Sequence, residues 1–174
     1  MKLLFISMGC DKNRVDTERM LGLILAERWE EPVELTDDEY EADVIVINSC
    51  CFINDAKEES INTILDMAER KKDGRARALI VTGCLAQRYR DEIRREIPEV
   101  DAVLGTNSGA QITAAIRSAL AGRFYEEYAA LTGIPDRGAG RVVTTGGHYA
   151  YLKIAEGCEK RCTYCIIPQI RGSY

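Results

Sequence analysis

Three cysteines near the end of the chain have the spacing of a metal-binding loop. Cys158, Cys162 and Cys165 form the pattern C-x3-C-x2-C in the stretch "GCEKRCTYCIIPQIRGSY". Three thiolates on one short loop can hold three irons of a cubane cluster and leave the fourth iron open to a small molecule. Zinc is the alternative metal, but a structural zinc site takes four protein ligands. The only histidine, His148, stands at the start of a predicted strand, roughly 25 Å from the loop at the usual rise per residue. The spacing favours an iron–sulfur cluster, unless a cysteine from elsewhere in the chain completes a zinc site.

Three further cysteines are far apart in the sequence but share one local setting. Cys10, Cys50 and Cys84 follow the apolar runs "KLLFIS", "DVIVINS" and "RALIVTG". In an open parallel sheet the carboxyl ends of the strands lie on one edge, where ligands bind. These three thiols are therefore predicted to meet at a shared metal site. Cys51 should point away from Cys50 because successive side chains of an extended segment alternate, and it is interpreted as a small packed residue, not a ligand.

Alternating strand and helix patterns must position these cysteines. The apolar runs and the helical spacing of apolar residues predict strands at 2–7, 33–35, 43–49, 77–83 and 101–105, and helices at 15–30, 55–71, 85–97 and 112–120. Such alternation indicates a parallel sheet covered by helices on both faces. The sequence therefore predicts an α/β, flavodoxin-like domain over residues 1–121.

The composition changes after this domain. Glycine and proline residues, among them Gly133, Pro135 and Gly138, predict a linker with little structure of its own over 122–148. The stretch "HYAYLKIAEG" that follows predicts one strand, which begins a second domain over 149–174. A single strand exposes two unpaired edges, so we expect the segment 123–174 to pack poorly on its own.

Composition and charge narrow the class of protein. The 174 residues are 46% hydrophobic and 29% charged, as in ordinary globular proteins, and the net charge of −5 suits a basic protein partner better than a nucleic-acid backbone. No apolar run approaches the roughly 18 residues of a membrane span, and the opening run Leu3–Met8 is too short for an export signal. The seven cysteines are therefore expected to be reduced thiols in the cytoplasm.

Other chemistries find little support in the sequence. The stretch "SMGCDKNRVD" after the first strand has a single glycine, whereas a flavin or nucleotide phosphate needs a loop rich in glycine or hydroxyl residues. No Ser-His-Asp or paired-carboxylate constellation is apparent, so no catalytic residue is assigned.

The motifs together resemble a known family. The pattern C-x3-C-x2-C with an aromatic residue before the last cysteine resembles the signature of radical S-adenosylmethionine enzymes. Together with "MGCDKNRVDTE", "NSCCFINDAKEESI" and "VTGCLAQRY", it makes the chain resemble the methylthiotransferases over essentially its whole length. The resemblance implies two [4Fe-4S] clusters, S-adenosylmethionine and an electron donor. It assigns an auxiliary cluster to Cys10, Cys50 and Cys84, the radical-generating cluster to Cys158, Cys162 and Cys165, and an S-adenosylmethionine contact to Tyr164.

Within that family, "GCDKNRVD", "DAKEESI" and "LKIAEGC" resemble the branch that modifies a ribosomal protein. This branch adds S-CH3 to the β-carbon of an aspartate in the small-subunit protein numbered twelve. Where the branch usually has glycine, this chain has Cys51, which leaves open that Cys51 substitutes as a ligand in an oxidised or apo form.

The resemblance also implies that the chain is an amino-terminal fragment. It would contain only the first strand and first loop of a truncated radical-SAM α/β barrel, and it should not catalyse alone. Two alternatives remain: a tRNA adenosine methylthiotransferase, for which nucleic acid would be the partner, and a non-catalytic iron–sulfur or zinc-binding module.

Overall fold

A parallel sheet forms the centre of the molecule. The computed structural model describes residues 1–132 and 140–174, and among these the sheet has six strands in the order β2-β1-β3-β4-β5-β6. All neighbouring strands are parallel. The strands are β1 (Lys2–Ser7), β2 (Glu34–Leu35), β3 (Val44–Ser49), β4 (Ala78–Gly83), β5 (Ala102–Leu104) and β6 (Tyr125–Glu127). The first five follow the flavodoxin-like order 2-1-3-4-5, which confirms the predicted α/β fold.

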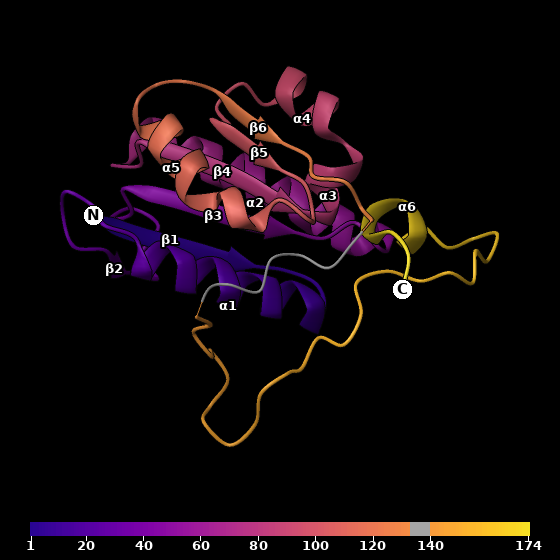
Figure 1. The fold of residues 1–174 in the computed structure, drawn as a ribbon. Helices are drawn as coiled ribbons and strands as arrows, with labels where there is room; N and C mark the ends of the chain where they lie inside the picture. The colour runs from indigo at the N-terminus through magenta and orange to yellow at the C-terminus, as the bar shows by residue number, and fades with distance from the viewer. Residues whose placement is uncertain (133–139) are drawn as a thin grey trace.

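Helices cover both faces of this sheet (Figure 1). The helices of the described residues are α1 (Asp11–Ala26), α2 (Asn54–Asp73), α3 (Cys84–Arg88), α4 (Arg90–Glu96), the 3₁₀ turn η1 (Gly109–Gln111), α5 (Ile112–Leu120) and α6 (Ile167–Arg171), the last of which lies at one end of the sheet. None of the helices in the described part of the chain is both long and apolar enough to cross a lipid bilayer.

Strands β3 and β4 are buried on both faces because two hydrophobic cores enclose them. Side chains alternate along each strand, so Val44 and Val46 join the core formed with α1 and α5. Ile45 and Ile47 join the opposite core, formed with α2, α3 and α4. This explains why the sequence of β3 is a continuous run of apolar residues.

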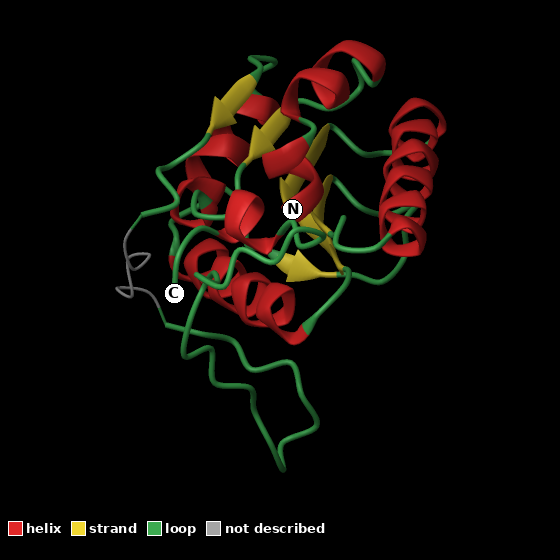
Figure 2. Cartoon of the chain, turned by 90° about the vertical axis from the view of Figure 1, so that its right-hand side faces the viewer, coloured by secondary structure: helices red, strands yellow, loops and turns green. Residues whose placement is uncertain are grey.

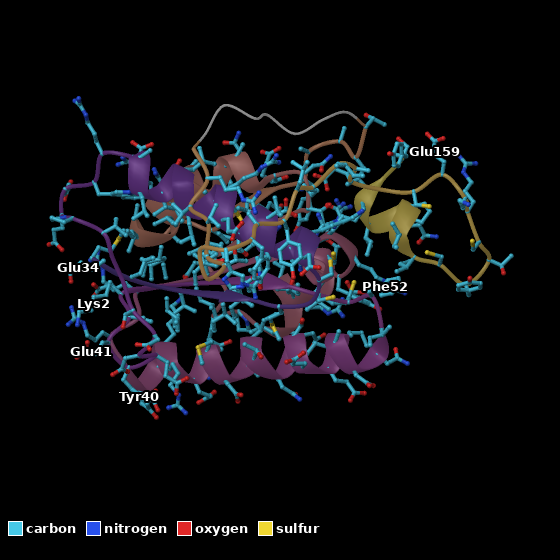
Figure 3. All side chains as sticks on the ribbon, turned by 90° about the horizontal axis from the view of Figure 1, so that it is seen from below. Lys2, Glu34, Tyr40, Glu41, Phe52 and Glu159 are labelled. Carbon is cyan, nitrogen blue, oxygen red and sulfur yellow. The ribbon has the colours of Figure 1, made fainter. Side chains whose placement is uncertain are left out.

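Different residues lie at the two ends of the parallel strands. Lys2, Glu34 and Glu41 lie at one end of the molecule, and Phe52 and Glu159 lie at the other (Figure 3). Since Phe52 follows β3, that second end is the carboxyl edge of the sheet. Helix α6 lies there too, although it belongs to the last residues of the chain (Figure 1).

Two helices differ from their predicted bounds. Helix α1 begins at Asp11, four residues before the predicted start, and ends at Ala26. The predicted helix over 85–97 is divided into α3 and α4, because Tyr89 has φ −122° and ψ 35°, outside the helical region.

The segment after residue 121 also departs from expectation. Residues 125–127 of the predicted linker form β6, because the exposed edge of β5 offers them backbone hydrogen bonds. Gly133, Pro135 and Gly138 lie outside the described residues. Residues 149–157 form no strand in the described structure, and Leu152 and Ile154 are 83% and 79% exposed. A strand needs a hydrogen-bonded neighbour, and this stretch runs alongside α1 instead.

Candidate metal centre

The strands that precede two of the scattered cysteines end in register at the carboxyl edge. Ser49 at the end of β3 pairs with Gly83 at the end of β4, and Cys50 and Cys84 follow these residues directly. Cys10 immediately precedes α1, at the end of the loop that follows β1. Figure 2 looks onto this edge of the sheet. The topology therefore places all three cysteines at the same edge, as the sequence predicts.

Gly9 allows the loop that carries Cys10 to approach Cys50 closely. Its φ is +84°, in the left-handed region that favours glycine. A Cβ atom added at Gly9 would lie 2.7 Å from both the Cβ and the Sγ of Cys50. Any larger residue would push the loop away from the Cys50 thiol.

Two buried asparagines hold the loops at this edge together. The Asn13 Nδ2 atom donates hydrogen bonds to the carbonyl oxygens of Met8 (2.9 Å) and Ser49 (3.0 Å). The Asn48 Nδ2 atom donates to the carbonyl oxygen of Asn13 (2.8 Å) and to the Thr17 Oγ1 atom (3.0 Å). Because these buried amides are satisfied, they fix the loop after β1, the end of β3 and the start of α1 to one another.

Cys84 lies in a buried, charged environment. Cys50 and Cys84 are each 5% exposed, whereas Cys10 is exposed. Burial raises the pKa of the Cys84 thiol, nearby Cys50 and Cys10 add to this rise, and the guanidinium of Arg171 opposes it. The Cys84 Sγ atom donates to the Asn13 Oδ1 atom at 3.9 Å.

Cys51 faces the core instead. It is 2% exposed among the apolar side chains between the sheet and α2. Its Sγ atom donates to the Cys84 carbonyl oxygen at 3.2 Å, and burial raises the pKa of its thiol to about 11. A thiol with this pKa is a poor source of the thiolate that binds a metal. The side chain packs where the alternation of an extended segment predicts.

The chemistry of the three thiols fits an iron–sulfur cluster, but their present spacing does not bring them together around one metal. Within residues 1–132 and 140–174, no three histidine, cysteine, aspartate or glutamate side chains lie close enough together to bind one metal ion. Thiolate sulfur is nevertheless the ligand that iron–sulfur clusters take. Cluster binding would therefore need a rotation of these cysteine side chains, and the exposed Cys10 has room for one.

The second cysteine trio lies on a loop that is closed at its base. The backbone N–H of Cys158 donates to the Gly172 carbonyl oxygen at 3.0 Å, and that of Cys165 donates to the Cys162 carbonyl oxygen at 3.0 Å. Cys158 and Cys165 are half-buried and Cys162 is exposed. Tyr164 is 90% exposed, so its ring is available to a ligand.

A buried arginine connects the two cysteine regions. Arg171, at the end of α6, is 3% exposed and reaches α1. Its guanidinium donates to the Asp16 Oδ2 atom (2.7 Å), to the Glu156 Oε2 atom (3.3 Å) and to the Asn13 Oδ1 atom. Lys153 pairs with the same two carboxylates. We call Asp16, Lys153, Glu156 and Arg171 the charge cluster.

Apolar contacts reinforce this attachment. Ile170 is 2% exposed within the core on the α2 side of the sheet, and its carbonyl oxygen accepts a hydrogen bond from Thr106 Oγ1 at 2.7 Å. The last residues of the chain thus pack on the sheet domain and do not form a separate unit with a core of their own.

Comparison with known proteins places the chain in a family. Residues 2–105 match the family described as "Uncharacterized protein family UPF0004". The chain belongs to this family.

Similarity to individual proteins covers the whole chain. "Ribosomal protein uS12 methylthiotransferase RimO" of Lachnoclostridium phytofermentans is 60% identical over 174 residues, which are 100% of this chain and 39% of that protein. Proteins of the same name from Natranaerobius thermophilus and Clostridium perfringens are 47% and 48% identical, over 100% and 99% of this chain and 38% of each relative. The chain thus spans less than two fifths of the length of these relatives.

The family match covers one cysteine trio, and the similarity to the individual relatives covers both. The UPF0004 match includes Cys10, Cys50 and Cys84 and ends before the terminal trio. The similarity to the three relatives extends over both trios.

Sequence reasoning missed Asn13, Asp16 and Arg171 at this site. All three stand inside the motifs "GCDKNRVD" and "IIPQIRG", close in the sequence to Cys10 and Cys165. A charged residue is usually solvated, so nothing in a single UPF0004 sequence indicates that the Arg171 guanidinium is buried against α1.

Proposed function

We propose that this chain is part of a radical S-adenosylmethionine methylthiotransferase that adds S-CH3 to the β-carbon of an aspartate in ribosomal protein uS12. The observation that carries the proposal is the position of three cysteines at one edge of the sheet, together with a second cysteine trio whose segment packs on the same edge. The name shared by relatives up to 60% identical supports the choice of substrate.

In this proposal each trio of thiols holds one [4Fe-4S] cluster. Cys10, Cys50 and Cys84 hold the auxiliary cluster, which is associated with sulfur insertion, and Cys158, Cys162 and Cys165 hold the other. When bound, the second cluster and S-adenosylmethionine supply the radical that breaks an unactivated C–H bond. The protein itself provides binding, orientation and exclusion of water. The exposed ring of Tyr164 is proposed to contact S-adenosylmethionine.

The charge of the chain is consistent with the proposed partner. A net charge of −5 suits a basic ribosomal protein, because opposite charges steer encounter. An electron donor is the second proposed partner, and the cytoplasm is the proposed location, since thiol ligands stay reduced there.

Counting metal ions tests the ligand assignment. The chain is reconstituted anaerobically with iron and sulfide, and iron is counted by Mössbauer spectroscopy. Two [4Fe-4S] clusters predict about eight irons per chain, and replacing either cysteine trio by alanine predicts about four. Zinc as the only metal retained would support the binding-module alternative, and unchanged iron after loss of Cys10, Cys50 and Cys84 would reject the first site.

A chimera tests the reaction. This chain replaces the corresponding 174 residues of the L. phytofermentans relative, to which it is 60% identical. With S-adenosylmethionine, a sulfur source and a reductant, we expect mass spectrometry to find a uS12 peptide heavier by one sulfur and one CH2 unit. The gain should vanish when Cys10, Cys50 and Cys84 are alanine. Modification of tRNA adenosine instead of uS12 would contradict the proposed substrate.

A further inference from the structure

Arg171 makes contacts that a purely structural surface arginine would not make. Its guanidinium is buried and holds two carboxylates on one side, Asp16 and Glu156. On the other side it donates to the Oδ1 atom of Asn13, whose Nδ2 atom joins the loop before Cys10 to the end of β3 before Cys50. The same Oδ1 atom lies 3.9 Å from the Cys84 Sγ atom.

The charges of the cluster balance without a contribution from the thiols. Asp16 and Glu156 carry two negative charges, and Lys153 and Arg171 carry two positive charges. Thiolates of the buried Cys50 and Cys84 would add further negative charge, and an uncompensated buried anion is costly. Arg171 lies near Cys84, because its guanidinium and the Cys84 Sγ atom both donate to the Asn13 Oδ1 atom. The guanidinium has five N–H donors to share among its partners.

We propose that Arg171 is a positioning residue of the three-cysteine site: it fixes Asn13 and places a cation and N–H donors beside the Cys84 sulfur. This inference rests on the proposed function, which makes Cys10, Cys50 and Cys84 cluster ligands. Hydrogen bonds to the sulfurs and local net charge set the reduction potential of an iron–sulfur cluster. Arg171 therefore raises the potential of the auxiliary cluster and slows its loss.

The inference also gives the carboxyl-terminal segment a role at the first site. Arg171 follows Cys165 by only six residues and is carried by the same segment. Attachment of that segment to α1 thus completes the surroundings of a cluster whose ligands all come from the first 84 residues.

The test uses a chain that can hold a cluster at only one site. Cys158, Cys162 and Cys165 are replaced by alanine, and this background is reconstituted anaerobically with iron and sulfide. Into it we introduce Arg171→Gln, Arg171→Lys or, as a control, Arg141→Gln. Arg141 attaches the same part of the chain to α1 through Glu18, with 2.6 Å between its Nε atom and the Glu18 Oε2 atom.

Three measurements separate positioning from folding. Redox titration gives the midpoint potential, electron paramagnetic resonance gives the g values of the reduced cluster, and a chelator gives the rate of iron release. For Arg171→Gln we expect a lower potential, shifted g values and iron release about tenfold faster, in line with other outer-shell substitutions. Arg171→Lys keeps the charge but loses the fork geometry, so it should restore part of each change. Arg141→Gln should match the background.

Each outcome decides between the two proposals. If the background retains no cluster, the ligand assignment fails and this inference fails with it. If the background holds a cluster and both Arg171 variants share its potential, g values and release rate, only the role of Arg171 is refuted. Should Arg171→Gln not fold by circular dichroism, the comparison of Arg171→Lys with the background decides in the same way.

Discussion

Gly22 is a position where α1 lies directly against the segment that begins at Gly140. A Cβ atom added there would lie 1.8 Å from the Gly140 carbonyl oxygen and 3.4 Å from the Arg141 Cα atom. These are backbone atoms, so Gly22→Ala must displace the segment that begins at Gly140. That segment is held by the buried Glu18, whose carboxylate accepts bonds from Arg141 Nε (2.6 Å), Thr144 N (2.7 Å) and Thr144 Oγ1 (2.8 Å).

The expected loss follows from these contacts. Three hydrogen bonds to a charged group at about 1.5 kcal/mol each amount to about 4.5 kcal/mol. Alanine returns about 1 kcal/mol through its higher helix propensity. We therefore expect Gly22→Ala to lower the free energy of unfolding by about 3.5 kcal/mol, which corresponds to about 10 °C in Tm for a chain of this size.

Urea denaturation followed by far-UV circular dichroism measures this loss. Asn62→Ala is the matched control, because it raises helix propensity at an exposed position of α2 without a clash, and it should stabilise by about 0.5 kcal/mol. If Gly22→Ala proves as stable as the wild type, or more stable, the attachment of the 140–145 segment to α1 is refuted.

Three other substitutions test separate parts of the structure. Burial alone would raise the pKa of the Glu18 carboxyl group, but hydrogen bonds from Thr144 and Arg141 lower that pKa below the ordinary 4.5. The lowered pKa stabilises the folded state above about pH 4.5, and this stability is lost as the pH falls through the folded-state pKa. Unfolding measured against pH should therefore show a shallower acid loss for Glu18→Gln, and an unchanged slope would contradict the buried ion pair. Gly9→Ala should reduce the iron retained at Cys10, Cys50 and Cys84, because the alanine Cβ atom would lie 2.7 Å from the Cys50 Sγ atom. Iron retention equal to that of the wild type in a metal assay would show that the close approach of Gly9 to Cys50 is not needed. Cys51→Ala should keep the full iron count, since that thiol faces the core, and loss of about four irons would instead make it a ligand.

Local signals in the sequence were sufficient for the first five strands of the sheet and for the edge at which the first three cysteines lie. The run "DVIVINS" predicts a strand buried on both faces, and β3 is such a strand. A parallel sheet puts the ends of its strands on one edge, so the strands before Cys10, Cys50 and Cys84 determine where these residues lie. This inference needs only the order of strands and turns, which a single sequence carries.

Other features depend on partners that are distant in the sequence. A lone apolar stripe over 85–97 does not reveal the break at Tyr89 that separates α3 from α4. Strand β6 forms because β5 presents a free edge, and the stretch 149–157 forms no strand in the described structure, where it lies against α1. Backbone hydrogen bonds between strands are long-range, so the pattern of one segment cannot specify whether a neighbour will be there.

The composition, order and spacing of the residues by themselves determined the class of fold and the edge of the sheet at which Cys10, Cys50 and Cys84 lie. Only the tertiary structure decided what surrounds those thiols. It brought Arg171 and Cys84 to the same oxygen atom of Asn13 and closed the charge cluster with Asp16 and Glu156, across more than 150 residues of sequence in the case of Asp16. A buried cation is stable only where all its partners converge, and that convergence is a property of the packed chain, not of any local pattern.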